Sequence, residues 1–359
     1  MIKRRIIIIF TVFLVLFLIT CCNKSESNPD ISEIKTETPD ISDSEKSKKI
    51  EYIKITQQEA YNMMTGEVII LDVRTQEEFD DGHILNAVLL PDYEIEEKAE
   101  SLIPGKNQII LVYCRTGVRS ANASKKLIDM GYTKVFDFGG IVDWEYKIVT
   151  DIDYTTTMKI NGEMPEFEFR LEGIKERYSY SEIVEAVYIS KMTISGKDGS
   201  FKQEFTDLST EIYTSKKDIY GLSFDDWNFD GYLDISLWQS VGGTMGNSPH
   251  YYWLWDNNAG LFIENKQLEE ISDYSTISII DTDGKNQITN FVHVGYEGDG
   301  IGYWEYTKGE YIHVKSKSVE WLHDDSEYIY HVIIEELIDG EMIITEDYFS
   351  NDYDEVYEN

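Results

Sequence analysis

The sequence predicts an α/β region with a parallel sheet, followed by a mostly antiparallel β region. In residues 51–150, short apolar runs alternate with segments at helical spacing, which is the pattern of a parallel sheet with helices on both faces. Beyond about residue 158 the helical spacing stops, and short runs rich in Tyr, Ile, Val and Trp are separated by Gly, Asp and Asn. The chain has 359 residues, of which 42% are hydrophobic, so it is long and apolar enough for two folded regions.

Residues 1–22 have the organisation of a bacterial export signal. Three basic residues near the start precede an apolar run over residues 6–19, which is too short for a comfortable membrane span. The run ends in Leu18-Ile19-Thr20-Cys21, which resembles a lipobox, where cleavage leaves a lipid-modified cysteine at the new N-terminus. Lipidation is expected on Cys21, with Cys22 as the alternative site, and an uncleaved anchor helix is the other interpretation. Either way, we expect the folded regions on the extracytoplasmic face of the cell membrane.

Residues 23–50 are expected to form a disordered, acidic tether. They are dominated by Ser, Thr, Asp, Glu, Lys and Pro, and they have no aromatic residue and no apolar periodicity. Such a segment buries too little surface to offset the entropy cost of ordering. It would hold the folded regions away from the membrane surface.

The α/β region begins at Glu51 and alternates strands with helices. Capping boxes, in which a Thr and a Glu three residues later each accept the other's backbone N–H, predict helix starts at Thr56 and Thr75. Apolar runs predict strands, and apolar residues at helical spacing predict two further helices. The strands are expected at 53–55, 68–71, 87–90, 109–112 and 135–136, and the further helices at 93–103 and 118–130.

Cys114 lies where such a sheet is expected to bind a ligand, between the strand that ends at Tyr113 and the next helix. Backbone N–H groups and the positive end of the helix dipole favour an anion at this place. Arg115 and Arg119 add positive charge, and Gly117 lets the backbone turn tightly around the sulfur. These features favour the thiolate, which is the reactive form of cysteine. A structural, buried cysteine is the alternative, but such cysteines favour apolar surroundings.

Three motifs in residues 51–150 resemble those of the rhodanese family. They are Asp72-Val73-Arg74 with Glu78-Phe79, Gly82-His83-Ile84 and Ala87 to Pro91; the loop Cys114-Arg115-Thr116-Gly117-Val118-Arg119-Ser120; and Gly139-Gly140 followed by Trp144. Their order and spacing match the family, and residues 85–90 depart mildly from its pattern in a way that concerns packing rather than chemistry. The resemblance implies the rhodanese fold, a parallel sheet with helices on both faces.

The resemblance also implies a single-domain sulfurtransferase that carries sulfane sulfur as a persulfide on Cys114. The thiolate would take the outer sulfur of a small anionic donor such as thiosulfate and pass it to a thiol or cyanide acceptor. The substrate-binding residues would be Arg115, Thr116, Gly117, Val118 and Arg119, whose amides would stabilise the persulfide. The two arginines would attract the donor, and sulfur transfer would require no cofactor.

A phosphatase of the cell-cycle type is a competing interpretation of the same fold. Such phosphatases resemble rhodaneses but have the spacing Cys-x5-Arg, a loop one residue longer. Here the sixth residue after the cysteine is Ser120, and the shorter loop suits sulfur better than a phosphoryl group. The polar residues of the first motif are interpreted as structural rather than catalytic, and they are Asp72, Arg74, Glu78 and His83.

Residues 158–345 are expected to form the β region, and residues 346–359 an acidic tail that frays. Turn signals such as Gly196-Lys197-Asp198-Gly199 and Lys308-Gly309-Glu310 separate the apolar runs and indicate antiparallel pairing. The six histidines are scattered and lack the spacing of a transition-metal site.

One segment of the β region resembles an EF-hand-type calcium loop. Oxygen ligands at loop positions 1, 3, 5, 7 and 9 would come from Asp226, Asn228, Asp230, the Tyr232 carbonyl and Asp234. Gly231 stands at position 6, where the loop turns sharply, but position 12 is Leu237 instead of the usual glutamate. Calcium is therefore a candidate cofactor, and a turn stabilised by its own Asx side chains is the alternative.

The β region also resembles, over residues 180–322, exported bacterial β domains related to FG-GAP-like repeat proteins. Some of these domains are lysozyme inhibitors or immunity proteins. Residues 151–359 contain 14 basic and 43 acidic residues, and this net charge of −29 would suit a basic protein partner or simply keep the surface solvated. The alternative function is therefore a target-binding protein whose rhodanese-like unit is a secondary sulfur-relay or interaction module. The charge of −35 on the whole chain argues against nucleic-acid binding, because it repels phosphates.

Overall fold

The computed structural model describes most of the chain after residue 50. The described residues are 51–183, 186–197, 199–213, 220–241, 248–273, 275–280, 284–293, 297–324 and 327–357. The signal-like segment 1–22, with Cys21 and Cys22, and the tether 23–50 lie outside these residues. Within the described ranges, no helix is both long and apolar enough to cross a membrane.

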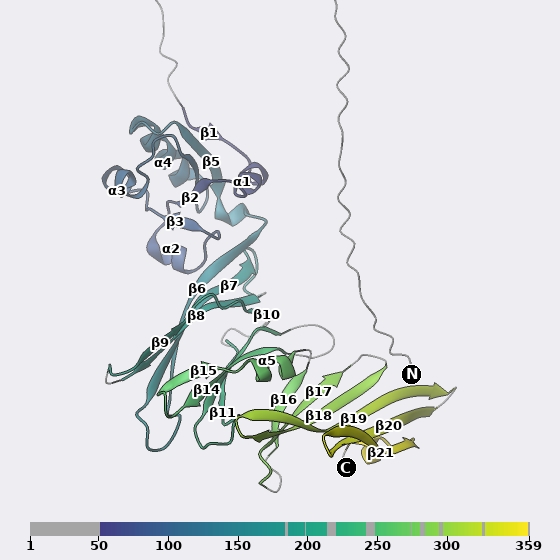
Figure 1. Cartoon of the computed structure of the whole chain (residues 1–359). Coiled ribbons are helices and arrows are strands. Elements are labelled where there is room, and N and C mark those ends of the chain that lie inside the picture. Colours follow the sequence, from purple (N-terminus) through teal and green to yellow (C-terminus); the bar gives the residue numbers. More distant parts are fainter. Residues whose placement is uncertain are drawn as a thin grey trace, which may run out of the picture. The chain divides into compact units, whose positions relative to one another are not determined.

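The α/β region contains a five-stranded parallel sheet, sheet A, in the order β1-β5-β4-β2-β3. Its strands are β1 (Ile53–Lys54), β2 (Val68–Asp72), β3 (Ala87–Leu89), β4 (Ile109–Cys114) and β5 (Lys134–Gly140). Its helices are α1 (Gln57–Met63), α2 (Gln76–Asp80), α3 (Ile95–Leu102), α4 (Val118–Asp129) and the short 3-10 helix η1 (Ile141–Asp143). Figure 1 shows α1 on one side of this sheet and α3 and α4 on the other. The predicted α/β fold is confirmed.

Successive residues of β4 face opposite sides of sheet A, as strand geometry requires. Val112 and Cys114 belong to the apolar cluster that contains residues of α3 and α4. Leu111 and Tyr113 belong to the cluster that contains residues of α1 and η1. All four are at most 1% exposed, so β4 is buried on both faces, which accounts for its uninterrupted apolar sequence.

Both predicted capping boxes are confirmed. The Thr56 side chain accepts the Glu59 N–H while the Glu59 carboxylate accepts the Thr56 N–H, and Thr75 and Glu78 are joined in the same way. A cap of this kind supplies partners for N–H groups that the first helical turn leaves free, and it stabilises a helix by about 1 kcal/mol. The second cap matters for the site, because Glu78 also contacts the cysteine loop.

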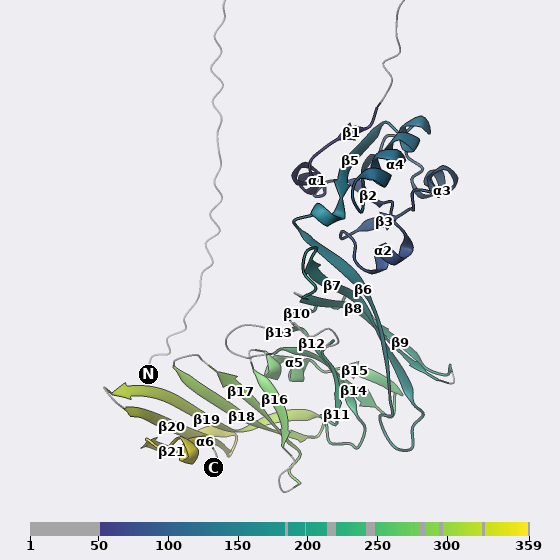
Figure 2. The same ribbon diagram turned by 180° about the vertical axis from the view of Figure 1, so that it is seen from behind.

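The β region contains three sheets among the described residues, with strands of the first visible in Figure 2. Sheet B has the order β13-β10-β8-β7-β6, and β9 pairs with β8. Its strands are β6 (Lys147–Met158), β7 (Phe167–Tyr178), β8 (Ala186–Gly196), β9 (Lys202–Phe205), β10 (Glu211–Tyr213) and β13 (Ser240–Val241). Sheet C, in the order β11-β12-β14-β15, contains β11 (Leu222–Asp225), β12 (Asp234–Trp238), β14 (His250–Asp256) and β15 (Leu261–Glu264).

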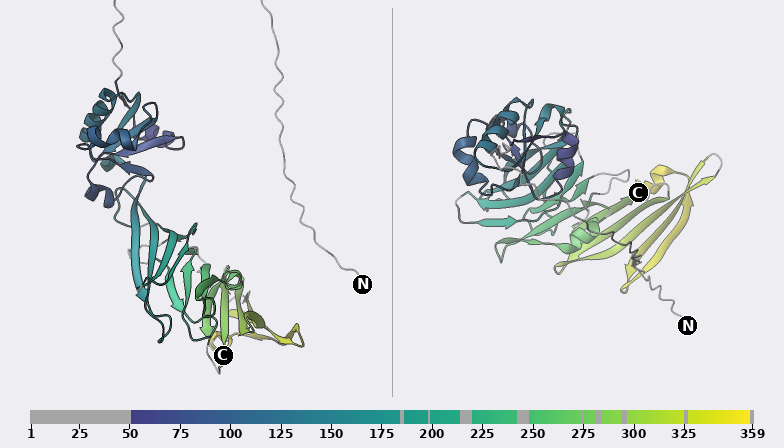
Figure 3. Two further views of the ribbon diagram at one scale, coloured as in Figure 1. Left: turned by 60° about the vertical axis from the view of Figure 1, so that its left-hand side comes forward. Right: turned by 90° about the horizontal axis from the view of Figure 1, so that it is seen from above.

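Sheet D runs in sequence order from β16 to β21, and its last strands are yellow in Figure 3. Its strands are β16 (Thr276–Ile280), β17 (Gln287–His293), β18 (Gly298–Thr307), β19 (Glu310–Asp324), β20 (Glu327–Ile338) and β21 (Glu341–Ser350). Two helices, α5 (Lys266–Ser272) and α6 (Tyr353–Tyr357), accompany these sheets. All described pairs in the β region are antiparallel except β10 with β13, as the sequence predicted for most of this region.

The β region begins earlier than expected. Its first strand, β6, begins at Lys147 rather than near residue 158, and it pairs with β7 along its whole length. Much of β6 is Asp- and Thr-rich and half-exposed, so it lacks the apolar run that marks a strand in the sequence. Pairing with a neighbour decides its structure instead.

The expectation of a fraying tail at residues 346–359 is wrong for its described part. The segment from Glu346 completes β21 and then forms α6. Val356 is fully buried, the Val356 carbonyl accepts a hydrogen bond from Lys317 Nζ at 2.5 Å, and Tyr357 Oη accepts one from Trp321 Nε1 at 2.9 Å. The acidic composition of the segment gave no sign that Val356 and Tyr357 would pack against the sheet.

Candidate functional site

Cys114 is the last residue of β4, one residue beyond the expected strand end, and α4 begins four residues later at Val118. Gly117 caps this helix with a φ of 95°, a left-handed conformation that a glycine adopts without strain. The Gly117 N–H donates a hydrogen bond to the Cys114 sulfur over 3.1 Å. The thiol is thus directed at the positive end of a twelve-residue helix, which favours a negative charge on the sulfur.

The cysteine lies beneath its own loop. Cys114 is only 1% exposed, whereas the side chains of Arg115, Thr116 and Val118 are exposed. A sulfur at this depth is largely shielded from water, so the loop amides interact with it more strongly than they would in bulk solvent.

The two glycines that end β5, Gly139 and Gly140, allow the cysteine loop to approach this strand. A Cβ on Gly140 would lie 2.4 Å from the Arg115 carbonyl oxygen and 2.6 Å from the Thr116 Cα, so no other residue fits there without displacing the loop. The Val142 N–H donates to the Arg115 carbonyl over 3.2 Å. Ser120 Oγ donates to the Gly117 carbonyl over 3.1 Å, which holds the end of the loop.

Arg119 is held by an ion pair. Its guanidinium donates two hydrogen bonds to the Glu78 carboxylate, at 2.7 and 2.8 Å, across 41 residues of sequence. The pairing with Arg119 lowers the pKa of Glu78 to about 2. Because Glu78 also caps α2, the pair ties the cysteine loop to that helix. Of the two loop arginines, only Arg115 has no ion pair or side-chain hydrogen bond among the residues that the structure describes.

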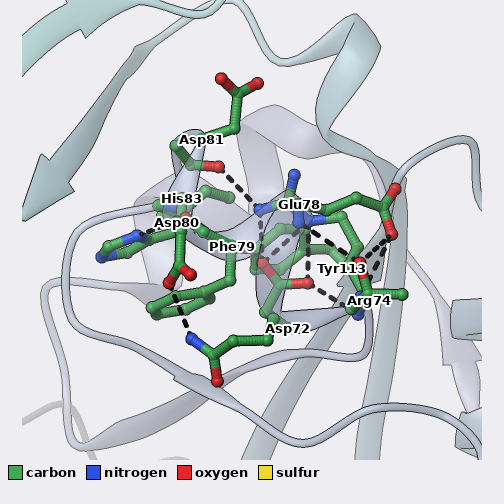
Figure 4. Close-up of polar contacts among 12 residues, drawn as sticks. Asp72, Arg74, Glu78, Phe79, Asp80, Asp81, His83 and Tyr113 are labelled. Atoms are coloured by element: carbon green, nitrogen blue, oxygen red, sulfur yellow. Dashed lines mark hydrogen bonds and ion pairs between the residues drawn. The ribbon is translucent and has the colours of Figure 1, made fainter.

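Asp72 and Arg74 form a buried pair next to this site (Figure 4). Arg74 Nη2 lies 2.7 Å from Asp72 Oδ2 and also donates to the Gly82 carbonyl over 2.7 Å. The side chains are 6% and 0% exposed. Tyr113 Oη accepts the Ile84 N–H over 3.2 Å, so the network links the ends of β2 and β4 to the segment before β3.

His83 takes part in packing. Its ring stacks on Phe79 with a centroid distance of 3.8 Å, and its Nδ1 lies 3.1 Å from the Phe79 carbonyl oxygen. The residue is 5% exposed, and its backbone forms a two-way bridge with Val149 of β6. These contacts agree with the structural role that the sequence indicated for His83.

The parallel sheet, the buried thiol and the tight loop at a helix N-terminus define an α/β domain whose candidate site is centred on a cysteine. The family model of the rhodanese-like domain matches residues 56–147. The chain is 37% identical over 73 residues to the thiosulfate sulfurtransferase PspE of Escherichia coli, covering 20% of this chain and 70% of that protein. It is 30% identical over 96 residues to the thiosulfate sulfurtransferase GlpE of Coxiella burnetii, covering 26% of this chain and 88% of that protein. Through these residues the chain belongs to the rhodanese-like family.

A solved structure also overlaps the chain more widely. The structure of a Xanthomonas type IV secretion system related protein covers 54% of this chain and 99% of its own, with 17% identity and a TM-score of 0.38. A score this low establishes no common fold.

In the segment expected to bind calcium, side-chain oxygens accept hydrogen bonds from the loop's own backbone. Asp226 accepts the N–H groups of Asp230 and Gly231 at 3.0 and 2.9 Å, and Asp230 accepts that of Tyr232 at 2.9 Å. Gly231 has a φ of 85°, the sharp turn that its position in the motif predicted. Asn228 Nδ2 donates to the Asp230 carboxylate over 3.1 Å.

Asp234, another expected ligand, is buried rather than exposed in the loop. It is fully buried at the start of β12, and its two oxygens accept the N–H groups of Trp227 and Trp255 at 2.9 and 2.8 Å. Burial raises the pKa of Asp234 to about 8. Within the described ranges, no three His, Cys, Asp or Glu side chains are grouped as a metal site. Calcium binding stays a prediction.

Proposed function

We propose that the rhodanese-like domain is an extracytoplasmic, membrane-anchored sulfurtransferase that carries sulfane sulfur on Cys114. The observation that carries this proposal is the buried thiol under the α4 N-terminus, with Gly117 donating to its sulfur. The names of the curated relatives support the reaction class. The signal-like residues 1–22, with Cys21 or Cys22 as the lipidated residue, support the membrane anchor.

The reaction would proceed in two displacements. The Cys114 thiolate attacks the outer sulfur of thiosulfate, the sulfur–sulfur bond of the donor breaks, and sulfite leaves with the bonding electron pair. The enzyme then holds a Cys114 persulfide. A nucleophilic acceptor such as cyanide or a thiolate attacks the terminal sulfur, and the Cys114 thiolate leaves, ready for another cycle.

The loop residues would have distinct roles in these steps. The amides of residues 115–119 and the α4 dipole would stabilise the anionic sulfur. Arg115, which has an exposed side chain, would attract the anionic donor. Arg119 would act mainly by fixing the loop, since Glu78 neutralises most of its charge.

The test is intact-mass measurement of the purified whole chain after incubation with thiosulfate. We expect a gain of one sulfur atom that cyanide removes with release of thiocyanate. Cys114→Ser is the matched control, since it keeps a small polar side chain where the Cys114 sulfur accepts the Gly117 N–H. Loss of both the mass gain and turnover is expected in this variant. A wild-type chain that gains no sulfur, or a variant that gains it equally, would contradict the proposal.

A second candidate function is binding of a basic protein by the β region. The observation that favours it is the charge of −29 over residues 151–359. The test is the activity of a basic lysozyme in the presence of the whole chain at low and at high salt. Inhibition that weakens with salt is expected, and Cys114→Ser should inhibit as well as the wild type does. Unchanged lysozyme activity would contradict this function and would mean that the acidic charge serves solubility alone.

A further inference from the structure

A cavity of about 320 Å³ lies beside the cysteine loop, and the β region supplies one of its walls. Arg74 and Arg115 of the α/β region line it together with three residues of the β region, Ile148, Arg177 and Ser179. These three residues lie outside the segment 56–147 that matches the rhodanese-like family. The β region therefore adds a surface next to the loop that the family domain does not itself contain.

Specific contacts hold this wall in place. The backbones of His83 and Val149 exchange hydrogen bonds of 2.9 and 2.8 Å, which pairs β6 with the segment after α2. Arg177 Nη2 donates to the Asp81 carbonyl over 3.0 Å. A Cβ on Gly82 would lie 3.1 Å from Arg177 Nη2, so the two segments are in close contact here. The guanidinium of Arg177 is thus fixed at the edge of the cavity.

Some charged side chains that line the cavity are paired with an opposite charge, and others are not. Arg74 is neutralised by Asp72, and the lining carboxylate Glu78 is neutralised by Arg119. Within the part of the chain that the structure describes, Arg177 donates to carbonyl oxygens, those of Asp81, Tyr178 and Ser181. Among the described residues, Arg115 and Arg177 are the cations of this cavity that have no carboxylate partner.

One lining carboxylate opposes these two cations. Asp81 is exposed at the C-terminal cap of α2, and no ion pair engages it within the described ranges. Figure 4 shows its carboxylate directed away from the Asp72–Arg74 pair. The unpaired groups of the lining therefore sum to one positive charge, in a chain whose total charge is −35.

We propose that Arg177, together with Arg115, binds the anionic group of a small organic thiol that accepts sulfur from Cys114. The volume of 320 Å³ is within the range of small-molecule sites and exceeds the needs of cyanide. Cys114 does not itself line the cavity, so the cavity would hold the carboxylate end of the acceptor while its thiolate reaches the loop. That thiolate attacks the outer sulfur of the persulfide, the sulfur–sulfur bond breaks, and the Cys114 thiolate leaves. This inference rests on the proposed sulfur transfer and specifies its acceptor.

The test compares an anionic with a neutral thiol acceptor, with thiosulfate as donor and the whole chain as enzyme. Arg177→Gln should lower kcat/KM for 3-mercaptopropionate about tenfold through KM, and change that for 2-mercaptoethanol less than about twofold. Arg170→Gln is the matched control, because Arg170 is on the same strand but pairs with Asp153, away from the cavity. Arg170→Gln should leave kcat/KM unchanged for both thiols. Arg177→Lys should restore part of the preference for the anionic thiol.

Asp81→Asn gives an effect of opposite sign. Removing this exposed carboxylate from a helix C-terminus should not harm the fold. It should raise kcat/KM for the anionic thiol about two- to threefold without affecting the neutral one. Equal changes for the two thiols in Arg177→Gln, or no effect of Asp81→Asn, would overturn the subsite while leaving sulfur transfer intact.

Direct binding separates this inference from the proposed function. Calorimetric titration of 3-mercaptopropionate into Cys114→Ser requires no turnover. Binding that becomes about tenfold weaker when Arg177→Gln is added to Cys114→Ser would support the subsite even in a protein that transfers no sulfur, in which case only the proposed function fails. Absence of binding would overturn the inference.

Discussion

The α/β region and the β region accommodate buried charge in opposite ways. In the α/β region, Asp72 is fully buried but paired with Arg74 at 2.7 Å. In the β region, Asp234 is equally buried, and its hydrogen-bond partners among the described residues are two backbone N–H groups. A cation balances the first carboxylate, whereas burial raises the pKa of the second to about 8, which favours its protonated form. The buried pair near the cysteine loop therefore keeps its charges at neutral pH, whereas the charge of Asp234 in the β region depends on pH.

Removing Arg74 should produce the largest loss of stability. Arg74→Met would leave Asp72 buried without a cation and also free the Gly82 carbonyl, and breaking a buried pair in this way costs about 3–5 kcal/mol. Arg170→Gln breaks the exposed pair with Asp153 in the β region and should have no measurable effect. Hydrogen exchange resolved by segment would measure both, with deprotection expected in β2 and β4 for Arg74→Met alone. Similar protection in the two variants would show that the buried pair is not needed for stability.

Features carried by neighbouring residues were predictable from the sequence. The capping boxes at Thr56 and Thr75 and the position of Cys114 at the junction of β4 and α4 depend on residues within a few positions of each other. The Arg119–Glu78 pair spans 41 residues, and neither residue indicates the other in the sequence. The sequence likewise does not indicate that Arg177 lies beside the cysteine loop. That position depends on contacts of β6 and β7 with the segment after α2. Only the three-dimensional arrangement brings these residues together.

The two regions should respond to pH in opposite directions. Burial raises the pKa of Asp234 from 3.8 to about 8, so the folded β region keeps a proton that the unfolded chain releases, and its stability should fall as pH rises from about 4 to 8. Arg119 lowers the pKa of Glu78 from 4.5 to about 2, so this contribution to the α/β region is complete above 4.5 and disappears as pH falls towards 2. Segment-resolved hydrogen exchange against pH would detect both slopes.

A matched variant tests whether Asp234 causes the loss of β-region stability as pH rises. Asp234→Asn keeps an oxygen that accepts N–H groups and removes the titrating proton, so it should flatten the decline of the β region between pH 4 and 8. Glu78→Gln should flatten the acid-side loss of the α/β region. A decline that persists in Asp234→Asn would assign it to other carboxylates of the acidic surface.

Calcium should have the smallest effect, confined to the β region. The carboxylates of Asp226 and Asp230 already accept N–H groups, yet each carboxylate oxygen has a further lone pair for a cation. With Leu237 at position 12, the affinity should be in the ~10⁻⁴–10⁻³ M range of weak extracellular sites. Millimolar calcium should therefore raise the melting temperature of the β region by a few degrees through mass action, and leave the α/β region unchanged.

The control for calcium is Asp230→Ala, which removes one ligand and the hydrogen bond to the Tyr232 N–H. Magnesium should stabilise the wild type less than calcium does, because it requires a tighter octahedral shell. Screening of the −29 charge by any divalent salt would stabilise wild type and variant alike, so only a calcium response that Asp230→Ala loses counts as site binding. Equal responses would mean that Asp226, Asn228 and Asp230 serve the turn alone.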